Sequence, residues 1–317
     1  MRPPGTEQRD ADESGSAVGP AGGRIVLDLG SGGDGWLQRL ADLELWCDLP
    51  LLPGARPAPR QAIAAPAPAG DPGRLVYDGP GSVTGRLERV RAWRSPAGFR
   101  TVEFERGERF RVDPSGGRLD AIPPAAADDL RALELALGAP LALALAIRGV
   151  HLLHASAIVA GGAVVALAGP SGSGKSTLAA AAARSDRWRR AADDILPVRL
   201  DEPPKALPAF PQLKLPPAEG WPAEAASTLA LAALVEIEHG PGGGAPRLER
   251  LHGAEALRAL VASTVAARLF DDTLLSAHLE RAGRAAGSLW IGRLRFASGE
   301  RGLAAALTAL EPLARNR

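Results

Sequence analysis

The stretch HLLHASAIVAGGAVVALAGPSGSGKSTL, residues 151–178, decides the fold. Its apolar run AVVALA (163–168) predicts a buried strand, and the alanine-rich run after Lys175 predicts a helix through about Arg184. Between these two runs, the segment GPSGSGKS (169–176) satisfies the pattern G-x-x-x-x-G-K-[ST]. A strand, a glycine-rich turn and a helix in this order are what a phosphate-binding P-loop requires.

The expected phosphate site comprises the loop and the first turn of the helix. Glycines let backbone N–H groups converge on phosphate oxygens, and the helix presents its positive N-terminal end. Lys175 is expected to reach the β- and γ-phosphates, and Ser176 to ligate Mg²⁺. The alternative is an accidental Gly/Ser turn, which is rare in a chain with three lysines. We therefore predict ATP and Mg²⁺ as ligands, with the binding residues Gly169, Pro170, Ser171, Gly172, Ser173, Gly174, Lys175, Ser176 and Thr177.

Two adjacent carboxylates follow the expected helix. Asp193 and Asp194 stand at the start of the apolar run ILPV, which predicts a strand beside the P-loop strand. Neighbouring side chains on a strand point to opposite faces, yet at a strand end both can reach a metal-nucleotide site. We assign Asp193, together with Ser176, to the metal, and the second carboxylate to the proton of a substrate hydroxyl. The alternative is a solvated aspartate pair in a turn.

A histidine precedes the strand that leads into the P-loop. His154, the loop that begins 15 residues later and the aspartate pair together resemble the catalytic core of HPr kinase/phosphorylase and its relatives. The resemblance implies an α/β fold with a P-loop kinase core of the HPr kinase/PEP carboxykinase type. It also implies ATP-dependent phosphorylation of a serine on a protein or peptide, with Asp194 as base and His154 tuning it electrostatically. The implied catalytic residues are His154, Lys175, Asp193 and Asp194.

The resemblance is close over about 150–200 and departs from the family further on. The glycine-rich signature segment with its metal-binding glutamate is not recognisable, which puts the reverse phosphorylase reaction in doubt. Glu236 and Glu238 are possible substitutes for that glutamate, or solvent-facing strand residues. Lys214 in PAFPQLKLPP either contacts a phosphate or is a solvated loop lysine. Because charge on a transferring phosphoryl group requires donors, an arginine is also expected, and the candidates are Arg268, Arg293 and Arg295.

The N-terminal part of the chain has a different character. Residues 1–23 predict a disordered tail, 24–125 a β-rich accessory domain and 126–317 the P-loop domain. In the accessory domain we expect RIVLDLG (24–30) as a strand, GWLQRLADLELW (35–46) as a short helix and 50–73 as a linker or long loop. Antiparallel strands are expected in the runs RLVY, VTGRLERVRAW, FRTVEFE and ERFRVD.

Composition excludes several classes of protein. The net charge of +1, from 37 basic and 36 acidic side chains, argues against a nucleic-acid partner. A single cysteine, Cys47, excludes a disulfide framework and fits the cytoplasm. Glu134, Gly138 and Pro140 interrupt the apolar run 133–147, so a buried helix pair is expected rather than a membrane span. His239, His252 and His278 have no metal-ligand spacing, so no zinc site is expected.

Three further classes of function compete with the kinase. A mechanical ATPase of the ABC type displays a similar loop, but its glutamine loop and LSGGQ-like segment are not found here. A degenerate kinase would bind nucleotide or grip a leader peptide without turnover. RIVLDLGSGGDG (24–35) also mimics the first motif of a methyltransferase, although the expected βαβ alternation does not follow. The sequence leaves a homo-oligomer open.

Overall fold

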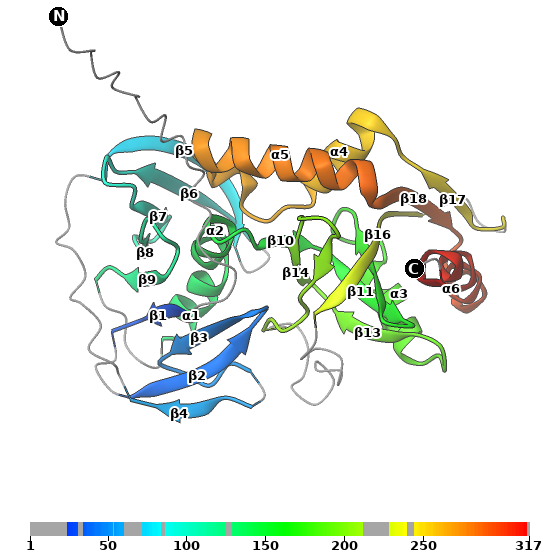
Figure 1. Cartoon of the computed structure of the whole chain (residues 1–317), viewed down its shortest axis with the longest axis horizontal. Coiled ribbons are helices and arrows are strands. Elements are labelled where there is room, and N and C mark those ends of the chain that lie inside the picture. The colour runs from blue at the N-terminus through cyan, green and yellow to red at the C-terminus, as the bar shows by residue number, and fades with distance from the viewer. Residues whose placement is uncertain are drawn as a thin grey trace, which may run out of the picture.

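The computed structural model divides its described strands between two nine-stranded β-sheets that lie side by side (Figure 1). The structure describes residues 24–30, 34–52, 54–59, 72–83, 86–123, 129–211, 228–239 and 244–315. The expected tail at 1–23 and the segment around Lys214 lie outside these residues. Mixed α/β content is therefore shown, whereas the expected boundary at residue 126 stays a prediction.

The first sheet contains the strands of the N-terminal part. Across the sheet they are β4 (Arg56–Ala58), β2 (Gly35–Leu40), β3 (Leu43–Cys47), β1 (Arg24–Asp28), β9 (Arg118–Ala121), β8 (Arg109–Val112), β7 (Arg100–Phe104), β6 (Arg86–Arg94) and β5 (Arg74–Val83). β1 runs parallel to both of its neighbours, and the pairs from β5 to β9 are antiparallel. Of the β-type runs expected between Arg74 and Leu119, RLVY lies in β5, FRTVEFE contains β7 and ERFRVD contains β8. The run VTGRLERVRAW contains β6, but its first residue, Val83, belongs to β5.

The segment 35–46 corrects the sequence-based prediction of a short helix. It forms the antiparallel hairpin β2–β3, which reverses at Ala41 with a φ of 54°. Pairing decides the matter, because β3 also lies parallel to β1 and buries Leu45 and Cys47 in the core. Tertiary partners override a weak helical pattern in this way. A hairpin after β1 also contradicts the methyltransferase interpretation, which needs a helix there.

Helices α1 (Leu130–Leu137) and α2 (Ala139–Ile147) cover the inner face of the first sheet. The Asp129 carboxylate accepts a hydrogen bond from the Ala132 amide and so caps α1. Gly138 ends α1 and precedes α2. By length and mean hydropathy, 1.8, the segment Leu130–Ile147 would be able to cross a membrane, but 67% of it is buried inside the protein. The expected buried helix pair is confirmed.

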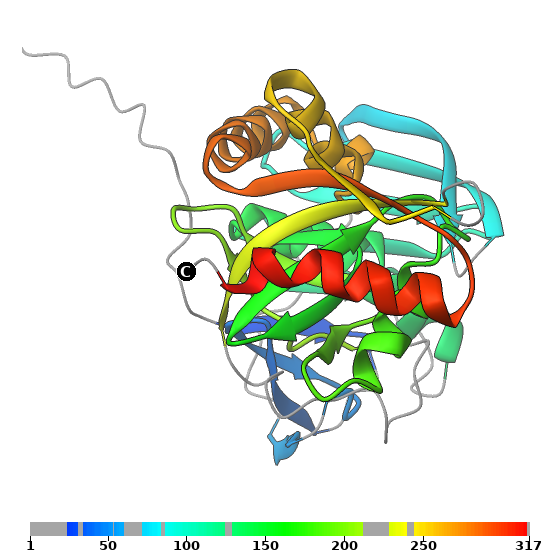
Figure 2. The same cartoon turned by 90° about the vertical axis from the view of Figure 1, so that its right-hand side faces the viewer.

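The second sheet carries helices on both faces (Figure 2). Its helical elements are α3 (Lys175–Ala183), α4 (Gly253–Ala262), η2 (Ala267–Leu269), α5 (Asp272–Ser288) and α6 (Glu300–Arg315). α4 and α5 pack on one face, and α3 and α6 pack on the other. Its strands are β10 (His151–His154), β14 (Ile195–Arg199), β15 (Lys205–Ala206), β16 (Leu229–His239), β12 (Ala163–Ala168), β11 (Ser156–Ala160), β13 (Arg189–Ala192), β18 (Trp290–Phe296) and β17 (Arg247–Arg250). The expected order of strand, glycine-rich loop and helix is confirmed by β12 and α3. The run ILPV forms β14, but the prediction that it lies beside the strand before the loop is wrong, because β14 lies between β10 and β15.

Ion pairs join the two sheets. Arg100 of β7 donates from Nε to the Asp271 carboxylate at 2.7 Å, and Asp271 also caps α5 through the amides of Thr273 and Leu274. Arg199 of β14 reaches Asp42, in the turn of the β2–β3 hairpin, at 2.6 Å. The first pair holds the start of α5 against the first sheet. The second pair holds the end of β14 against the first sheet.

Candidate functional site

The loop after β12 has the geometry of an anion cradle. Gly169, Gly172 and Gly174 have φ angles of 132°, 81° and 93°, which favour glycine because a Cβ is strained there. A Cβ on Gly169 would lie 3.0 Å from the Ile237 carbonyl oxygen. Gly174 begins α3 without any side-chain cap. The first-turn amides of the helix therefore face the loop, where an anion is favoured.

Two polar side chains are buried within this loop. The Lys175 ammonium donates to the carbonyl oxygens of Gly169 and Pro170 at 2.8 and 3.0 Å. The Ser173 hydroxyl is buried and has no hydrogen-bond partner among the described residues. A buried hydroxyl without a partner is costly, and phosphate oxygens would supply acceptors for it. Ser171, Ser176 and Thr177 are exposed, and the last two lie in the first turn of α3.

The aspartate pair and the histidine belong to one antiparallel ribbon. β10 pairs with β14 through His154↔Ile195, and β11 pairs with β13 through Ala157↔Ala192. β10 ends at His154 and β11 begins at Ser156, so the ribbon is interrupted at Ala155. The register is the same on both sides of this break, so Ala155 and Ser156 lie opposite Asp194 and Asp193. The Ala155 amide donates to the Asp194 carbonyl at 3.1 Å. The Ser156 hydroxyl donates to the Asp193 carbonyl.

This break in the ribbon and the P-loop lie at the same end of the strands. β11 is antiparallel to β12 with Ser156↔Leu167 in register, so the start of β11 is beside the end of β12. β13 ends beside the start of β11, and Asp193 follows it directly. Since neighbouring strands are about 4.8 Å apart, the backbones of Gly169 and Asp193 leave the sheet about 10 Å apart. The expected His154, Lys175 and aspartate pair thus converge on one edge.

The side chains of His154 and Asp194 approach each other at this edge. His154 Nε2 lies 3.6 Å from Asp194 Oδ1, and the two side chains are 49% and 29% exposed. The His154 amide donates to the Ser263 carbonyl at 2.7 Å, which fixes the backbone from the α4 side. Asp193, by contrast, is buried. Adjacent residues of the pair therefore have different surroundings, one open to a substrate and one enclosed.

The candidate glutamates and arginines form a separate ion-pair ladder. β16 and β18 are parallel and pair Glu236 with Arg293 and Glu238 with Arg295. Arg293 contacts Glu236 at 3.0 Å and Glu238 at 2.7 Å, and Arg295 contacts Glu238 at 2.7 Å. The hydrogen bond to Glu236 raises the pKa of Arg293 above its usual value. Glu236 lies opposite Ala168, the last residue before the P-loop, so the ladder borders the candidate site.

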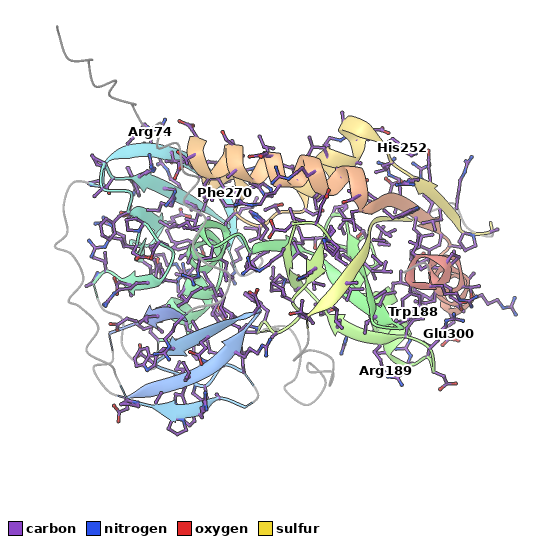
Figure 3. All side chains as sticks on the ribbon, viewed as in Figure 1. Arg74, Trp188, Arg189, His252, Phe270 and Glu300 are labelled. Carbon is purple, nitrogen blue, oxygen red and sulfur yellow. The ribbon has the colours of Figure 1, made fainter. Side chains whose placement is uncertain are left out.

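Other candidates lie elsewhere. Arg268 is in η2, which packs beside β5 of the first sheet. His278 lies in α5 and its ring centroid is 4.4 Å from that of His151, in an interior region that also contains Phe270 (Figure 3). Burial lowers the pKa of His278 to about 4 and the pKa of His151 well below its usual value. These two histidines are therefore neutral structural groups at pH 7.

Sequence reasoning missed Ser156. Its hydroxyl holds the carbonyl of Asp193 from across the ribbon, in the break between β10 and β11. The signal was weak: a small polar residue two positions after His154, in an otherwise apolar strand. β10 and β11 separate at Ala155, so Ser156 begins a new strand.

The residues present fit a nucleoside triphosphate with its metal. Left-handed glycines, an uncapped helix start, a buried lysine and an unpartnered buried hydroxyl suit phosphate oxygens. Ser176 and Asp193 are the two oxygen donors that we expect to hold Mg²⁺. In the described part of the chain, no group of three or more His, Cys, Asp or Glu side chains could hold a metal by itself. Substrate phosphates would have to complete the coordination, as is usual for Mg²⁺.

Comparison with known proteins adds no further identification. No known protein family matches the chain, and no characterised protein is significantly similar to it in sequence. The function is therefore argued from the geometry of the loop, the ribbon and the ladder.

Proposed function

We propose that the chain is an ATP-dependent kinase that transfers the γ-phosphoryl group to a serine hydroxyl of a protein or peptide. One observation carries the proposal: the register from His154↔Ile195 to Ala157↔Ala192 is continuous, so His154 and Asp194 lie at the strand ends next to the glycine-rich loop. A P-loop alone serves motors, switches and kinases alike. A partly exposed carboxylate beside a histidine at these strand ends supports hydroxyl activation in particular.

The proposed reaction is an in-line displacement at phosphorus. The serine oxygen forms a bond to the γ-phosphorus while the bond to the oxygen that bridges the β- and γ-phosphorus atoms breaks, and ADP leaves with that electron pair. The proton of the serine hydroxyl passes to the Asp194 carboxylate. His154, 3.6 Å from that carboxylate, orients it. Lys175 and the amides of the loop bind the phosphate oxygens and stabilise the charge of the transition state.

The metal site of the proposal uses Ser176 and Asp193. Mg²⁺, when bound with ATP, supplies neutralisation of the phosphate charge. Ser156 keeps Asp193 in place through its carbonyl. The hydrogen bond between these two residues therefore positions the metal carboxylate and the base next to it.

The first experiment measures ATP binding and phosphoryl transfer separately. Binding of a fluorescent ATP analogue is measured for the wild type and for Lys175→Met, and labelled ATP is supplied with a degenerate serine peptide pool and with water as acceptors. We expect Lys175→Met to lose nucleotide affinity. We expect Asp194→Asn to keep that affinity within a few-fold but to lose about 10²- to 10⁴-fold in transfer rate.

Asp201→Asn is the matched control, because Asp201 is an exposed aspartate that follows β14 and lies 4.0 Å from Arg281. It should behave as the wild type in both assays. An Asp194→Asn enzyme that transfers phosphate at the wild-type rate would remove the assigned base. A wild type that does not bind ATP would contradict the whole proposal.

A second candidate function is a nucleotide-binding regulatory or leader-peptide-binding module with little turnover. The ladder favours it, because Arg293 and Arg295 engage both Glu236 and Glu238. Glutamates held by arginines are poor metal ligands, and arginines held by glutamates are poor stabilisers of a transition state. Tight ATP binding with no transfer to any peptide or to water would select this function.

A further inference from the structure

β13 is an edge strand of the second sheet that leads directly to the aspartate pair. It pairs with β11 along one side, and no other described strand pairs with it. α3 packs against it. An edge strand offers a row of backbone N–H and C=O groups on which an extended polypeptide can add a further strand.

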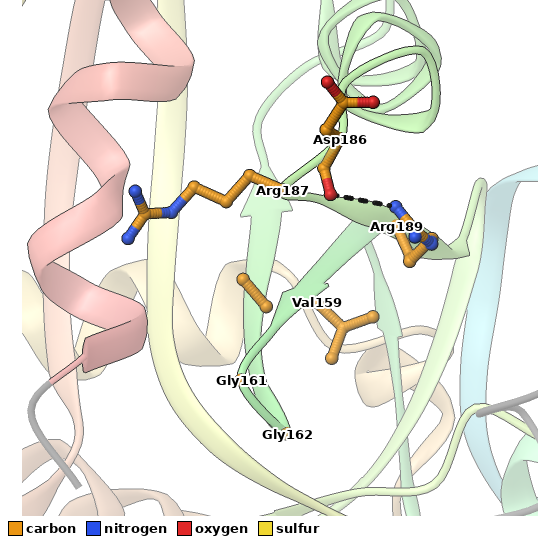
Figure 4. Close-up of a pocket in the computed structure, with 7 residues that line it drawn as sticks. Val159, Gly161, Gly162, Asp186, Arg187 and Arg189 are labelled. Carbon is orange, nitrogen blue, oxygen red and sulfur yellow. Dashed lines mark hydrogen bonds between the residues drawn. The ribbon is translucent and has the colours of Figure 1, made fainter.

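The start of β13 lies beside a basic depression. Its volume is about 210 Å³, and its lining includes Val159, the Gly161–Gly162 turn, Asp186, Arg187 and Arg189 (Figure 4). The Arg189 guanidinium donates through Nη1 to backbone carbonyls, among them that of Trp188 at 3.1 Å. Arg187 contacts Glu311 of α6 at 2.8 Å. The depression is therefore framed by two guanidinium groups.

The charge of this segment is one-sided. Residues 184–190, RSDRWRR, contain four arginines and one aspartate. Arg184, Arg187 and Arg189 are exposed, while Trp188 is fully buried and anchors the segment in the core. A rigid, exposed arginine cluster on a strand start is suited to acidic side chains, because guanidinium groups bind carboxylates through paired N–H donors.

The depression and the aspartate pair are the two ends of a track along β13. Arg189 lies opposite Val159 at the far end, and Ala192 lies opposite Ala157 just before Asp193. Five residues separate Arg189 from Asp194, a span of about 17 Å in an extended strand. A polypeptide paired with β13 would cover the same distance in about five residues.

Resting on the proposed kinase function, we propose that β13 is the docking strand for the acceptor. The occupant is an extended acidic peptide segment that adds to the edge of β13. Its serine lies at Asp194, and one or two acidic side chains, four to five residues away, lie at Arg189 and are within the field of the neighbouring Arg187. An incoming carboxylate takes the place of Glu311 at Arg187. Backbone pairing supplies affinity, and the spacing between acid and serine supplies specificity.

The test uses fluorescein-labelled eleven-residue peptides with a central serine. Two carry paired glutamates four and five residues from the serine, on the N-terminal side in one and on the C-terminal side in the other. Two matched sets replace the glutamates by glutamine or lysine. Binding is followed by fluorescence anisotropy, and phosphoryl transfer by labelled ATP. One of the two glutamate peptides should bind at least tenfold more tightly than its glutamine counterpart.

Charge reversal sharpens the test. Arg187→Glu/Arg189→Glu should abolish the preference for glutamate and create a preference for the lysine peptide. Arg247→Glu/Arg250→Glu is the matched control, because β17 is another edge strand with exposed arginines at both ends. If the reversed variant melts at a lower temperature, Arg187→Gln/Arg189→Gln provides the same comparison without added repulsion.

The outcomes separate the docking site from the kinase. Equal binding of glutamate and glutamine peptides, or equal loss in the β17 control, overturns the docking strand even if phosphate is transferred. Acid-selective binding that needs Arg187 and Arg189, without transfer to any peptide, keeps the docking strand and overturns the kinase. An oligonucleotide of equal charge that binds as tightly as the glutamate peptide also overturns the peptide proposal.

Discussion

The two sheets of this protein expose their polar groups in different places. In the first sheet the inner face is apolar against α1 and α2, while the other face carries ion pairs such as Arg89 with Asp78. In the second sheet helices cover both faces, and all six residues of β12 are buried. A sheet enclosed on both faces can present polar groups to a substrate only where its strands end. The P-loop, the aspartate pair and the glutamate–arginine ladder all lie there.

The ion pair between Arg100 of the first sheet and Asp271 at the start of α5 is where we expect a substitution to have the largest effect on stability. Asp271 is 1% exposed and contacts Arg100, whereas its neighbour Asp272 is 85% exposed and contacts Arg74. Asp271→Ala leaves a largely buried guanidinium without its partner, so it should lower the free energy of unfolding by about 3 to 5 kcal/mol. Asp272→Ala should cost less than about 1 kcal/mol. Urea unfolding of both variants measures the difference, and equal losses would mean that this ion pair contributes nothing special.

Truncating a leucine in each sheet compares a doubly covered strand with an open one. Leu167 of β12 is fully buried, and Leu87 of β6 is 79% exposed. Leu167→Ala should lower the free energy of unfolding by about 2 to 5 kcal/mol through lost burial and a cavity. Leu87→Ala should stay within about 0.5 kcal/mol of the wild type. Denaturant midpoints at constant slope give both values, and a large loss at Leu87 would show that the outer face is covered after all.

The buried histidine pair predicts a pH effect on stability. Burial lowers the pKa of His278 to about 4 from 6.5, and lowers the pKa of His151 as well, with His278, Arg281 and Arg199 adding repulsion. The unfolded chain therefore binds more protons below about pH 6.5. Stability should be complete above that pH and should fall by about 1.4 kcal/mol per pH unit for His278 as the pH drops toward 4, and protonation of His151 should add to the loss.

His151→Leu is the variant that checks this pH effect. Urea unfolding between pH 4.5 and 8 should show about half of the wild-type slope below pH 6.5 for this variant. A slope unchanged by the substitution would mean that other groups, such as buried carboxylates, cause the acid sensitivity.

The smallest expected effect concerns the thiol in the first sheet. Burial raises the pKa of Cys47 to about 12, so the folded protein contains almost no thiolate at pH 8. A disulfide reagent should leave folded protein unmodified over hours and should react with one thiol per chain in denaturant. Rapid labelling without denaturant would show that β3 opens readily at the edge of its core.

The sequence predicted the elements that local patterns encode. The loop from Gly169 to Ser176, the strand before it and the helix after it were all readable, because glycine spacing and apolar runs are local signals. The hairpin at 35–46 was not, since its conformation depends on pairing with β1, a partner outside the segment.

The candidate site was readable in part. Its residue types and spacing pointed to His154 and the aspartate pair, but not to the position of Ser156 opposite Asp193 or to the arginines that engage Glu236 and Glu238. Those contacts depend on the register between strands that are far apart in the chain. A one-residue change of register would reverse which side chains face each other.

The sequence by itself determined a glycine-rich loop between a strand and a helix, because glycine, lysine and serine at fixed spacing suffice to shape it. Only the tertiary structure decided that the break in the ribbon of β10–β11 and β13–β14 lies beside that loop, with His154 and Asp194 3.6 Å apart. The physical reason is range: a loop is made by neighbouring residues, whereas a meeting of three strand ends requires the pairing of the whole sheet.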